Sequence, residues 1–130
     1  MRKGVFKLVL TGLFLMTALS GVVSTAKEAP AFASNDVVAL ASLPPQAQTT
    51  YQLVLQGGPF PYDKDGDIFG NRERQLPSQP RGYYHEYTVK TPGASNRGTR
   101  RIVCGGQPVT APQACYYTAD HYASFRKIVP

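Results

Sequence analysis

The part of the chain that says most about the fold is residues 83–104, with the sequence YYHEYTVKTPGASNRGTRRIVC. Tyr83 to Lys90 is rich in aromatic and β-branched residues, which is the composition of a strand. Thr91-Pro92-Gly93-Ala94 predicts a turn, and Thr99 to Cys104 predicts a second strand. The turn should fold this second strand back beside the first, so the segment predicts an antiparallel pair.

Shorter strand signals lie on both sides of this pair. Tyr116 to Ala119 and Ser124 to Val129 predict two more strands. The β-branched run from Asp36 to Leu40 predicts a segment at the edge of the sheet.

Helical periodicity is found in residues 42–57. Apolar residues recur there at helical spacing among polar ones: Ala47, Tyr51, Val54 and Leu55. Ser42 is the expected N-cap, Pro44 and Pro45 fit the first turn, and Gly57 begins a stop signal. One helix followed by short strands predicts an α+β fold, with one N-terminal amphipathic helix packed on a twisted antiparallel β-sheet.

The first 33 residues have the features of a secretory signal peptide, because basic residues precede an apolar run from Leu8 to Val23 and small residues follow it. Cleavage is expected after Ala33, with Ala26 as the alternative, which leaves residues 34–130 as the mature domain. A retained anchor is the other interpretation, but about 16 apolar residues are few for a spanning helix. We therefore expect a secreted, extracellular domain with no membrane anchor after cleavage.

Removal of the signal changes the charge balance. The first 33 residues hold four of the 14 Lys and Arg residues and one of the 8 Asp and Glu residues. Residues 34–130 therefore carry ten basic residues against seven acidic ones, a net charge of +3. Six of the ten are arginines between Arg72 and Arg101. This mild excess is compatible with a polyanionic partner.

Neither of the two patterns that suggest a metal site fits one. Cys104 and Cys115 lack a histidine at ligand spacing, and in an exported protein an intrachain disulfide is the default interpretation. The alternating aspartates of residues 63–67 suggest a calcium loop, but the sixth and twelfth positions hold Ile68 and Arg74. We therefore expect a disulfide, a solvated turn, and no metal or other cofactor.

The first predicted strand places a histidine beside a glutamate, which suggests an acid–base pair. Neighbouring side chains on a strand point to opposite faces, so His85 and Glu86 cannot both face one phosphate. If Glu86 is catalytic, His85 is a hydrogen-bonded structural residue and the acid must be the other histidine, His121. Arg97 and Arg101 share a face if the chain between them is extended, and could then converge with the carboxylate.

Six segments, in order along the chain, resemble a known family: GPFPY (58–62), FGNRE (69–73), YYHEYTV (83–89), TPGA (91–94), RGTRRI (97–102) and YYTADHY (116–122). On these residues the chain resembles the small guanyl-specific ribonucleases secreted by Streptomyces, which are relatives of barnase. The resemblance runs from about Leu40 to Ile128, nearly the whole mature domain. It implies the microbial ribonuclease fold.

The resemblance also implies a metal-independent endoribonuclease that cleaves single-stranded RNA after guanosine. Glu86 would take the proton from the ribose 2′-hydroxyl, and His121 would protonate the leaving 5′-oxygen. A 2′,3′-cyclic phosphate would form and then be hydrolysed to a 3′-phosphate. Arg97 and Arg101 would neutralise charge on the phosphoryl oxygens. A catalytically silent secreted RNA- or protein-binding module on the same fold is the alternative.

Guanine selection is assigned by the resemblance to one loop and one tyrosine. Glu73 would face the guanine N1–H and exocyclic amine, and backbone N–H groups near Asn71 and Arg72 would meet O6. Phe69 and Tyr122 would sandwich or flank the base. Arg72 would add to the phosphate-binding surface. Adenine lacks the N1–H and the amine, so the site would reject it.

Two residue positions depart from the pattern of the family. Relatives often carry glutamine where this chain has Gly70, which should alter guanine affinity. Relatives often join a cysteine near the amino end to one near the carboxyl end, whereas Cys104 and Cys115 would clasp a local hairpin. The family further implies that the protein is a monomer, that single-stranded RNA is its substrate, and that a barstar-like inhibitor meets it inside the producing cell.

Overall fold

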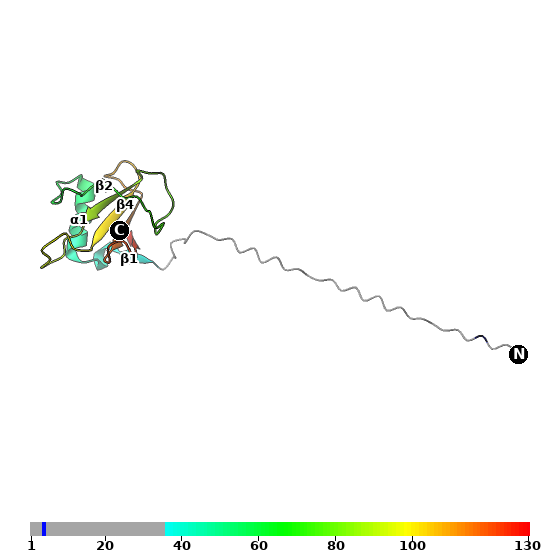
Figure 1. Cartoon of the computed structure of the whole chain (residues 1–130). Helices are drawn as coiled ribbons and strands as arrows, with labels where there is room; N and C mark the ends of the chain where they lie inside the picture. The colour runs from blue at the N-terminus through cyan, green and yellow to red at the C-terminus, as the bar shows by residue number, and fades with distance from the viewer. Residues whose placement is uncertain (1–3, 5–35) are drawn as a thin grey trace.

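A computed structural model describes residues 36–130 and, among the first 35 residues, Gly4 alone (Figure 1). The expected signal peptide over residues 1–33 and its two cleavage sites therefore lie outside the described segment. Within residues 36–130, no helix is long and apolar enough to cross a membrane.

The described strands form one six-stranded sheet. Along the chain they are β1 (Val37–Ala39), β2 (Asp67–Ile68), β3 (Tyr84–Thr88), β4 (Arg101–Gly105), β5 (Ala114–Thr118) and β6 (Arg126–Val129). Their order across the sheet is β1-β6-β5-β4-β3-β2. Every neighbouring pair is antiparallel except β1 with β6, which is parallel. The α+β prediction is confirmed, with two differences: the sheet contains one parallel pair, and the sequence pattern did not predict β2.

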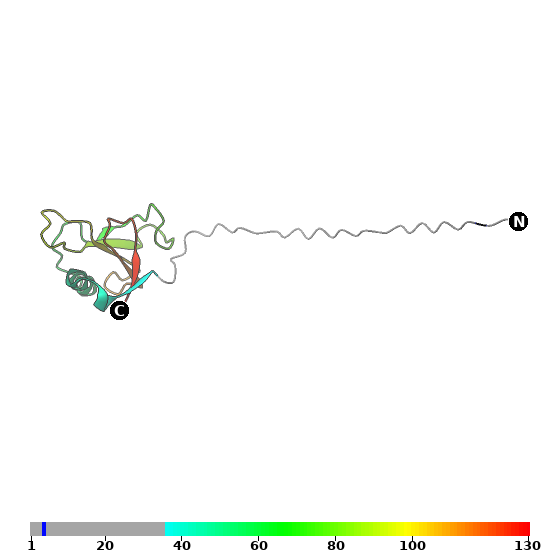
Figure 2. The ribbon, with the colours of Figure 1, turned by 90° about the horizontal axis from the view of Figure 1, so that it is seen from below.

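The helix α1 (Pro45–Gln56) lies on one face of the sheet (Figures 1 and 2). Its N-cap is Pro44, and no side chain caps it, so the expected Ser42 cap is wrong. Ser42 instead ends a short 3-10 helix, η1 (Leu40–Ser42). The physical reason is that a residue before proline is kept extended, so α1 cannot start before Pro45. Gly57 ends α1 in the left-handed conformation (φ 81°), as predicted.

The buried side of α1 differs from the predicted one by one position. Ala47 and Val54 are buried as expected, but Leu55 is 40% exposed. Thr50 is buried in its place, and its hydroxyl donates a hydrogen bond of 3.0 Å to the carbonyl oxygen of Thr88. A polar residue fits this face because the end of β3 offers its hydroxyl an acceptor.

The two faces of the sheet bury different clusters. The face under α1 buries a large cluster that includes Tyr87, Ile102 and Tyr117. The opposite face buries a smaller cluster of five side chains: Leu76, Tyr84, Val103, Tyr116 and Phe125. Side chains of directly paired residues lie on the same face of a sheet. The site described below is therefore on the face opposite α1, because Glu86 pairs with Val103.

His85 lies on the face under α1, since it pairs with Cys104. The predicted separation of His85 from Glu86 is thus confirmed. The imidazole of His85 makes no hydrogen bond to the residues of the described segment, so the predicted hydrogen bond has no protein partner there. Cys104 and Cys115 sit directly opposite each other on β4 and β5, with Cα atoms 4.1 Å apart, and form the expected disulfide.

The aspartate-rich segment forms the expected turn. The N–H of Asp65 donates to the carbonyl oxygen of Tyr62 at 3.0 Å. The Asp65 carboxylate accepts hydrogen bonds from the N–H of Tyr62 at 3.2 Å and of Thr88 at 2.7 Å. This turn therefore ties the start of β2 to the end of β3, next to Glu86.

Candidate active site

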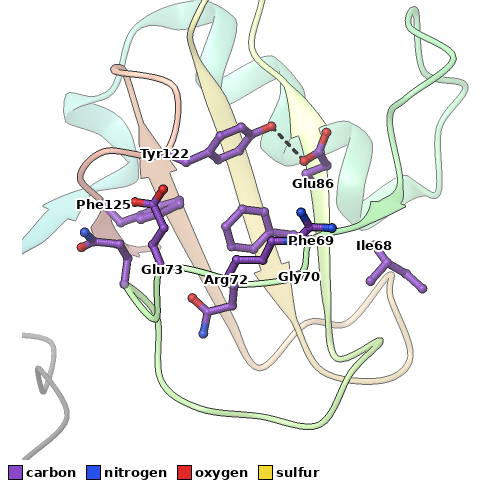
Figure 3. Close-up of a pocket in the computed structure, with 10 residues that line it drawn as sticks. Ile68, Phe69, Gly70, Arg72, Glu73, Glu86, Tyr122 and Phe125 are labelled. Carbon is purple, nitrogen blue, oxygen red and sulfur yellow. Dashed lines mark hydrogen bonds between the residues drawn. The ribbon is translucent and has the colours of Figure 1, made fainter.

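The face of the sheet opposite α1 carries a pocket of about 310 Å³ (Figure 3). Its walls are Ile68, Phe69, Gly70, Asn71, Arg72, Glu73, Gln75, Glu86, Tyr122 and Phe125. Glu86 and the five residues expected to bind guanine are therefore brought together. Ile68, Gln75 and Phe125 also line the pocket and were missed. Phe125 fell inside a predicted strand, where its aromatic ring gave no sign of facing a pocket.

Glu86 is held from two sides. The hydroxyl of Tyr122 donates a hydrogen bond of 2.8 Å to its Oε2 (Figure 3). On the other side, Nη2 of Arg97 lies 3.6 Å from its Oε1. The Glu86 side chain is 15% exposed, so one part of the carboxylate still reaches the pocket.

Arg97 reaches Glu86 from a loop. Its Nε and Nη2 donate to the hydroxyl oxygen of Thr88 at 3.0 and 2.8 Å, which fixes the guanidinium beside the strand. The chain between Arg97 and Arg101 is not extended, so the condition under which the two arginines would share a strand face is not met. Gly98 has a φ of 68°, in the left-handed region, so the chain turns there and joins β4 only at Arg101.

Arg101 is buried beneath this loop, with only 2% of its surface exposed. Its Nη1 donates to the carbonyl oxygens of Arg100 at 2.7 Å and Arg97 at 3.4 Å. Its Nε is buried without an acceptor, and it makes no ion pair with the residues described. The centre of the guanidinium lies 6.0 Å from the middle of the Tyr122 ring. A buried cation with an unused donor is complementary to an anion.

His121 lies on the turn that follows β5. Its ring centroid is 4.9 Å from that of Tyr122, and its side chain is exposed. The N–H of His121 donates to the carbonyl oxygen of Thr99 at 2.9 Å, which ties this turn to the loop that carries Arg97. Glu86 and His121, 35 positions apart in the chain, are therefore linked through one tyrosine ring.

Asp120, which sequence reasoning did not single out, braces the His121 turn. Its carboxylate accepts hydrogen bonds from the hydroxyl of Thr118 at 2.8 Å and from the N–H and hydroxyl of Ser124. These bonds, led by the one from the Ser124 hydroxyl, lower the pKa of Asp120 below its ordinary value. The turn needs such bracing because both His121 and Tyr122 have positive φ angles, of 54° and 72°.

The Tyr122 ring packs against Phe69, which bears on the two expected arrangements, a sandwich around the base or a flanking position. The centroids of the Tyr122 and Phe69 rings are 5.2 Å apart, with 30° between their planes. This separation is that of two rings packed directly against each other, so they do not sandwich a base in this conformation. The pKa of Tyr122 is raised to about 12, chiefly by burial and secondly by the hydrogen bond to Glu86. Its hydroxyl is therefore a hydrogen-bond donor at neutral pH.

The pocket loop is shaped by Asn71, whose φ is 50°. Its side-chain amide donates to the carbonyl oxygen of Leu76 at 2.9 Å and accepts from the N–H of Leu76 at 3.1 Å. Both polar groups of the Asn71 side chain are therefore used in hydrogen bonds within the loop. The backbone N–H groups of Asn71 and Arg72 donate to none of the residues described, so both can donate a hydrogen bond to a ligand.

Comparison with known proteins identifies the family. Residues 25–129 match the family model of ribonuclease. The chain belongs to the ribonuclease family. It is 57% identical to guanyl-specific ribonuclease Sa of Kitasatospora aureofaciens over 94 residues. The matched residues make up 72% of this chain and 94% of that protein. It is 54% identical over 89 residues to guanyl-specific ribonuclease St of Saccharopolyspora erythraea, which covers 68% and 83%.

Solved structures agree with this membership. The ribonuclease matches ribonuclease Sa2 crystallised with guanosine-2′-cyclophosphate at a TM-score of 0.65 and 49% identity, over 72% of this chain and 94% of that one. It matches ribonuclease Sa2 with 3′-GMP at a TM-score of 0.63 and 47% identity, with the same coverage. The family predicted from six short segments is confirmed, as is its α+β fold.

The predicted site residues of this ribonuclease fall into two groups. Glu86 and the loop from Phe69 to Glu73 line the pocket, together with Tyr122. Arg97, Arg101 and His121 do not line it but surround Glu86 and Tyr122 at one end. Among residues 36–130, no three His, Cys, Asp or Glu side chains are grouped so as to hold a metal ion.

Proposed function

We propose that this ribonuclease is a guanyl-preferring endoribonuclease that cleaves single-stranded RNA on the 3′ side of guanosine. The observation that carries the proposal is the meeting of a carboxylate, two arginines and a histidine at one end of the pocket. Its relatives Sa and St are guanyl-specific ribonucleases, which supports the same preference here.

Glu86 and His121 are the proposed base and acid. The Glu86 carboxylate removes the proton from the ribose 2′-hydroxyl, and the freed oxygen forms a bond to the adjacent phosphorus. The bond from phosphorus to the 5′-oxygen breaks, and His121 gives its proton to that oxygen. This yields a 2′,3′-cyclic phosphate. Water then opens the cycle with the two roles reversed, and a 3′-phosphate results.

Arg97 and Arg101 are proposed to stabilise the charge that gathers on the phosphoryl oxygens. Arg101 is suited to this task because it is buried, has an Nε without an acceptor, and is fixed by two carbonyl oxygens before any substrate binds. Fixed donors in a partly dry site stabilise a developing charge better than water does. Arg97 is fixed in the same way by Thr88.

Guanine recognition is proposed for the loop from Phe69 to Glu73. The exposed carboxylate of Glu73 would accept hydrogen bonds from N1–H and the exocyclic amine, and the free N–H groups of Asn71 and Arg72 would donate to O6. Phe69 would flank the base on one face, since no base fits between it and Tyr122. Ribonuclease Sa2 has been crystallised with guanosine-2′-cyclophosphate and 3′-GMP, which supports guanine binding by this ribonuclease.

The base preference is tested by cleavage of GpU against ApU in the presence of a chelator. We expect GpU to be cut far faster, because adenine leaves the Glu73 carboxylate without donors. Equal rates would remove the guanine preference. Binding of RNA with no cyclic-phosphate product would favour the alternative, a catalytically silent module. Glu73→Gln should lower the ratio of the two rates, and Glu73→Asp should keep more of it.

The acid–base assignment is tested by three variants. Glu86→Gln and His121→Ala should each lower kcat by about 10²- to 10⁴-fold, the usual contribution of a general acid or base. His85→Ala is the matched control, because His85 lies on the opposite face of the sheet. Loss of turnover in a folded His85→Ala protein with an active His121→Ala protein would reverse the assignment.

We also infer that the mature protein is secreted as a monomer and is met inside the producing cell by an acidic, barstar-like inhibitor. Arg72, Arg97 and Arg101 present positive charge around the site, to which the carboxylates of such a partner are complementary. A barstar-type protein at micromolar excess should lower the rate of GpU cleavage. An unchanged rate would remove this partner.

A further inference from the structure

A second hollow, of about 410 Å³, adjoins the pocket that was proposed above to bind guanine and is called the guanine pocket here. It is lined by Ile68, Gly70, Arg72, Gln79 and Arg81, and the first three of these also line the guanine pocket. The two hollows therefore lie on either side of a wall formed by Gly70 and Arg72. A nucleic acid strand with its guanine in the first hollow has its neighbouring backbone within reach of the second.

The second hollow is lined by cations and lacks any carboxylate. Arg72 and Arg81 are both exposed, and neither makes a hydrogen bond or ion pair with the residues that the structure describes. Gln79 adds an amide that can donate. Two unpaired guanidinium groups around one hollow repel each other and are complementary to a phosphate, which they can grip with paired N–H donors.

Arg72 packs against Gly70 between the two hollows. A Cβ atom at position 70 would lie 3.5 Å from Cγ and 3.8 Å from Nε of Arg72, which is ordinary van der Waals contact. Figure 3 shows the Arg72 side chain extending past Gly70 along the pocket. Gly70 and Arg72 together therefore separate the two hollows.

The place of the second hollow indicates which phosphate it suits. The leaving nucleotide follows the scissile phosphate and must lie beside His121, which lines neither hollow. The second hollow instead adjoins the end of the guanine pocket formed by Ile68 and Gly70. We propose that it is a subsite for the phosphate on the 5′ side of the guanosine, gripped by Arg81 together with Arg72. This subsite rests on the proposed guanyl-preferring cleavage.

The experiment compares kcat/KM for GpU, for pGpU with a 5′-phosphate, and for GpUp with a 3′-phosphate. The wild-type protein should prefer pGpU to GpU by about fivefold, the upper end for an exposed charge-assisted contact. Arg81→Ala should remove most of this preference, since Arg72 remains, and should leave GpU cleavage unchanged. It should also reduce the slope of log KM against log salt for pGpU by about 0.7, as loss of one phosphate contact on a single strand does.

Arg126→Ala is the matched control, because it removes the same charge from β6 and leaves both hollows intact. Equal losses in Arg81→Ala and Arg126→Ala would overturn the subsite, since they would reflect net charge alone. A preference for GpUp in place of pGpU would also overturn it. If the wild-type protein cleaved none of the three, the proposed function itself would fail, which is a different result from equal cleavage of all three.

Discussion

The hydroxyl of Tyr122 donates a hydrogen bond of 2.8 Å to Oε2 of Glu86, across the sheet face opposite α1. The Tyr122 ring also lies 4.9 Å from the His121 ring and 6.0 Å from the guanidinium of Arg101, measured from the ring centroid. One side chain thus contacts the proposed base and lies beside the proposed acid and a buried arginine. The hydrogen bond orients the carboxylate on which the mechanism depends.

Tyr122→Phe should therefore lower kcat for GpU by about tenfold and change KM less. The variant keeps the ring and loses the hydrogen bond, and a bond to a charged group contributes about 1.5–3 kcal/mol, reduced here because the site is partly open to water. Tyr51→Phe is the control, because Tyr51 packs against the core on the α1 side. A higher KM with an unchanged kcat would mean that Tyr122 serves binding alone.

Gly98 offers a test of how the loop presents Arg97. Its φ is 68°, and an added Cβ would clash with the hydroxyl of Thr91 and lie 2.9 Å from the Thr91 Cβ. Gly98→Ala should lower the free energy of unfolding by about 3 kcal/mol, from backbone strain and overpacking together. It should also lower kcat, because the loop must shift and Arg97 shifts with it.

Gly93→Ala measures the cost of backbone strain without that of overpacking. Gly93 has a similar φ of 77°, but an added Cβ would meet nothing within 4 Å. This variant should lose about 1 kcal/mol, from backbone strain alone, and keep its activity. Urea denaturation and GpU cleavage measure both quantities. If Gly98→Ala and Gly93→Ala lowered the free energy of unfolding equally, the Thr91 side chain would be able to move aside freely, and the loop would not be tightly packed.

The parts of the fold that the sequence predicts are those governed by local rules. Alternation along β3 placed Glu86 and His85 on opposite faces, and the turn at Pro92-Gly93 paired β3 with β4. The parallel pairing of β1 with β6 was not predictable, because it joins the two ends of the described chain. Thr50 was missed because its burial depends on a carbonyl oxygen of β3.

The candidate site residues follow from the sequence more directly than their arrangement does. Glu86, His121 and the arginines were predicted from the residue types and their order, through the family resemblance. The arrangement depends on positive φ angles at Gly98, His121 and Tyr122, which turn the chain before β4 and after β5. Propensity does not predict such angles for histidine or tyrosine, since tertiary hydrogen bonds impose them.

Burial of tyrosines predicts an alkaline limit to stability. Burial is the first cause of a raised pKa in four of them: Tyr84, Tyr87, Tyr116 and Tyr122. A raised pKa in the folded state means that the contribution to stability is full below the ordinary value of 10.0 and is lost as pH rises through the folded values. The free energy of unfolding should therefore fall above about pH 10.

Spectrophotometric titration checks this prediction. These four tyrosines should ionise only well above pH 10 or when the protein unfolds. Tyr122→Phe should remove one late-titrating group, whose pKa is about 12 in the folded protein. Ionisation of these four tyrosines near pH 10, with the fold intact, would contradict the burial of their hydroxyls.

The disulfide should contribute to stability and not to catalysis. Cys104 and Cys115 join β4 to β5 on the face that carries α1, whereas Glu86 lies on the other face. The double variant Cys104→Ala, Cys115→Ala should lose about 2–3 kcal/mol of unfolding free energy, the value for a loop this short, and keep its kcat for GpU.

Reduction of the wild-type protein should give a similar loss in urea denaturation and leave the double variant unaffected. A fall in kcat in the folded variant would mean that the brace across β4 and β5 also sets the position of Arg101, which begins β4 on the catalytic face.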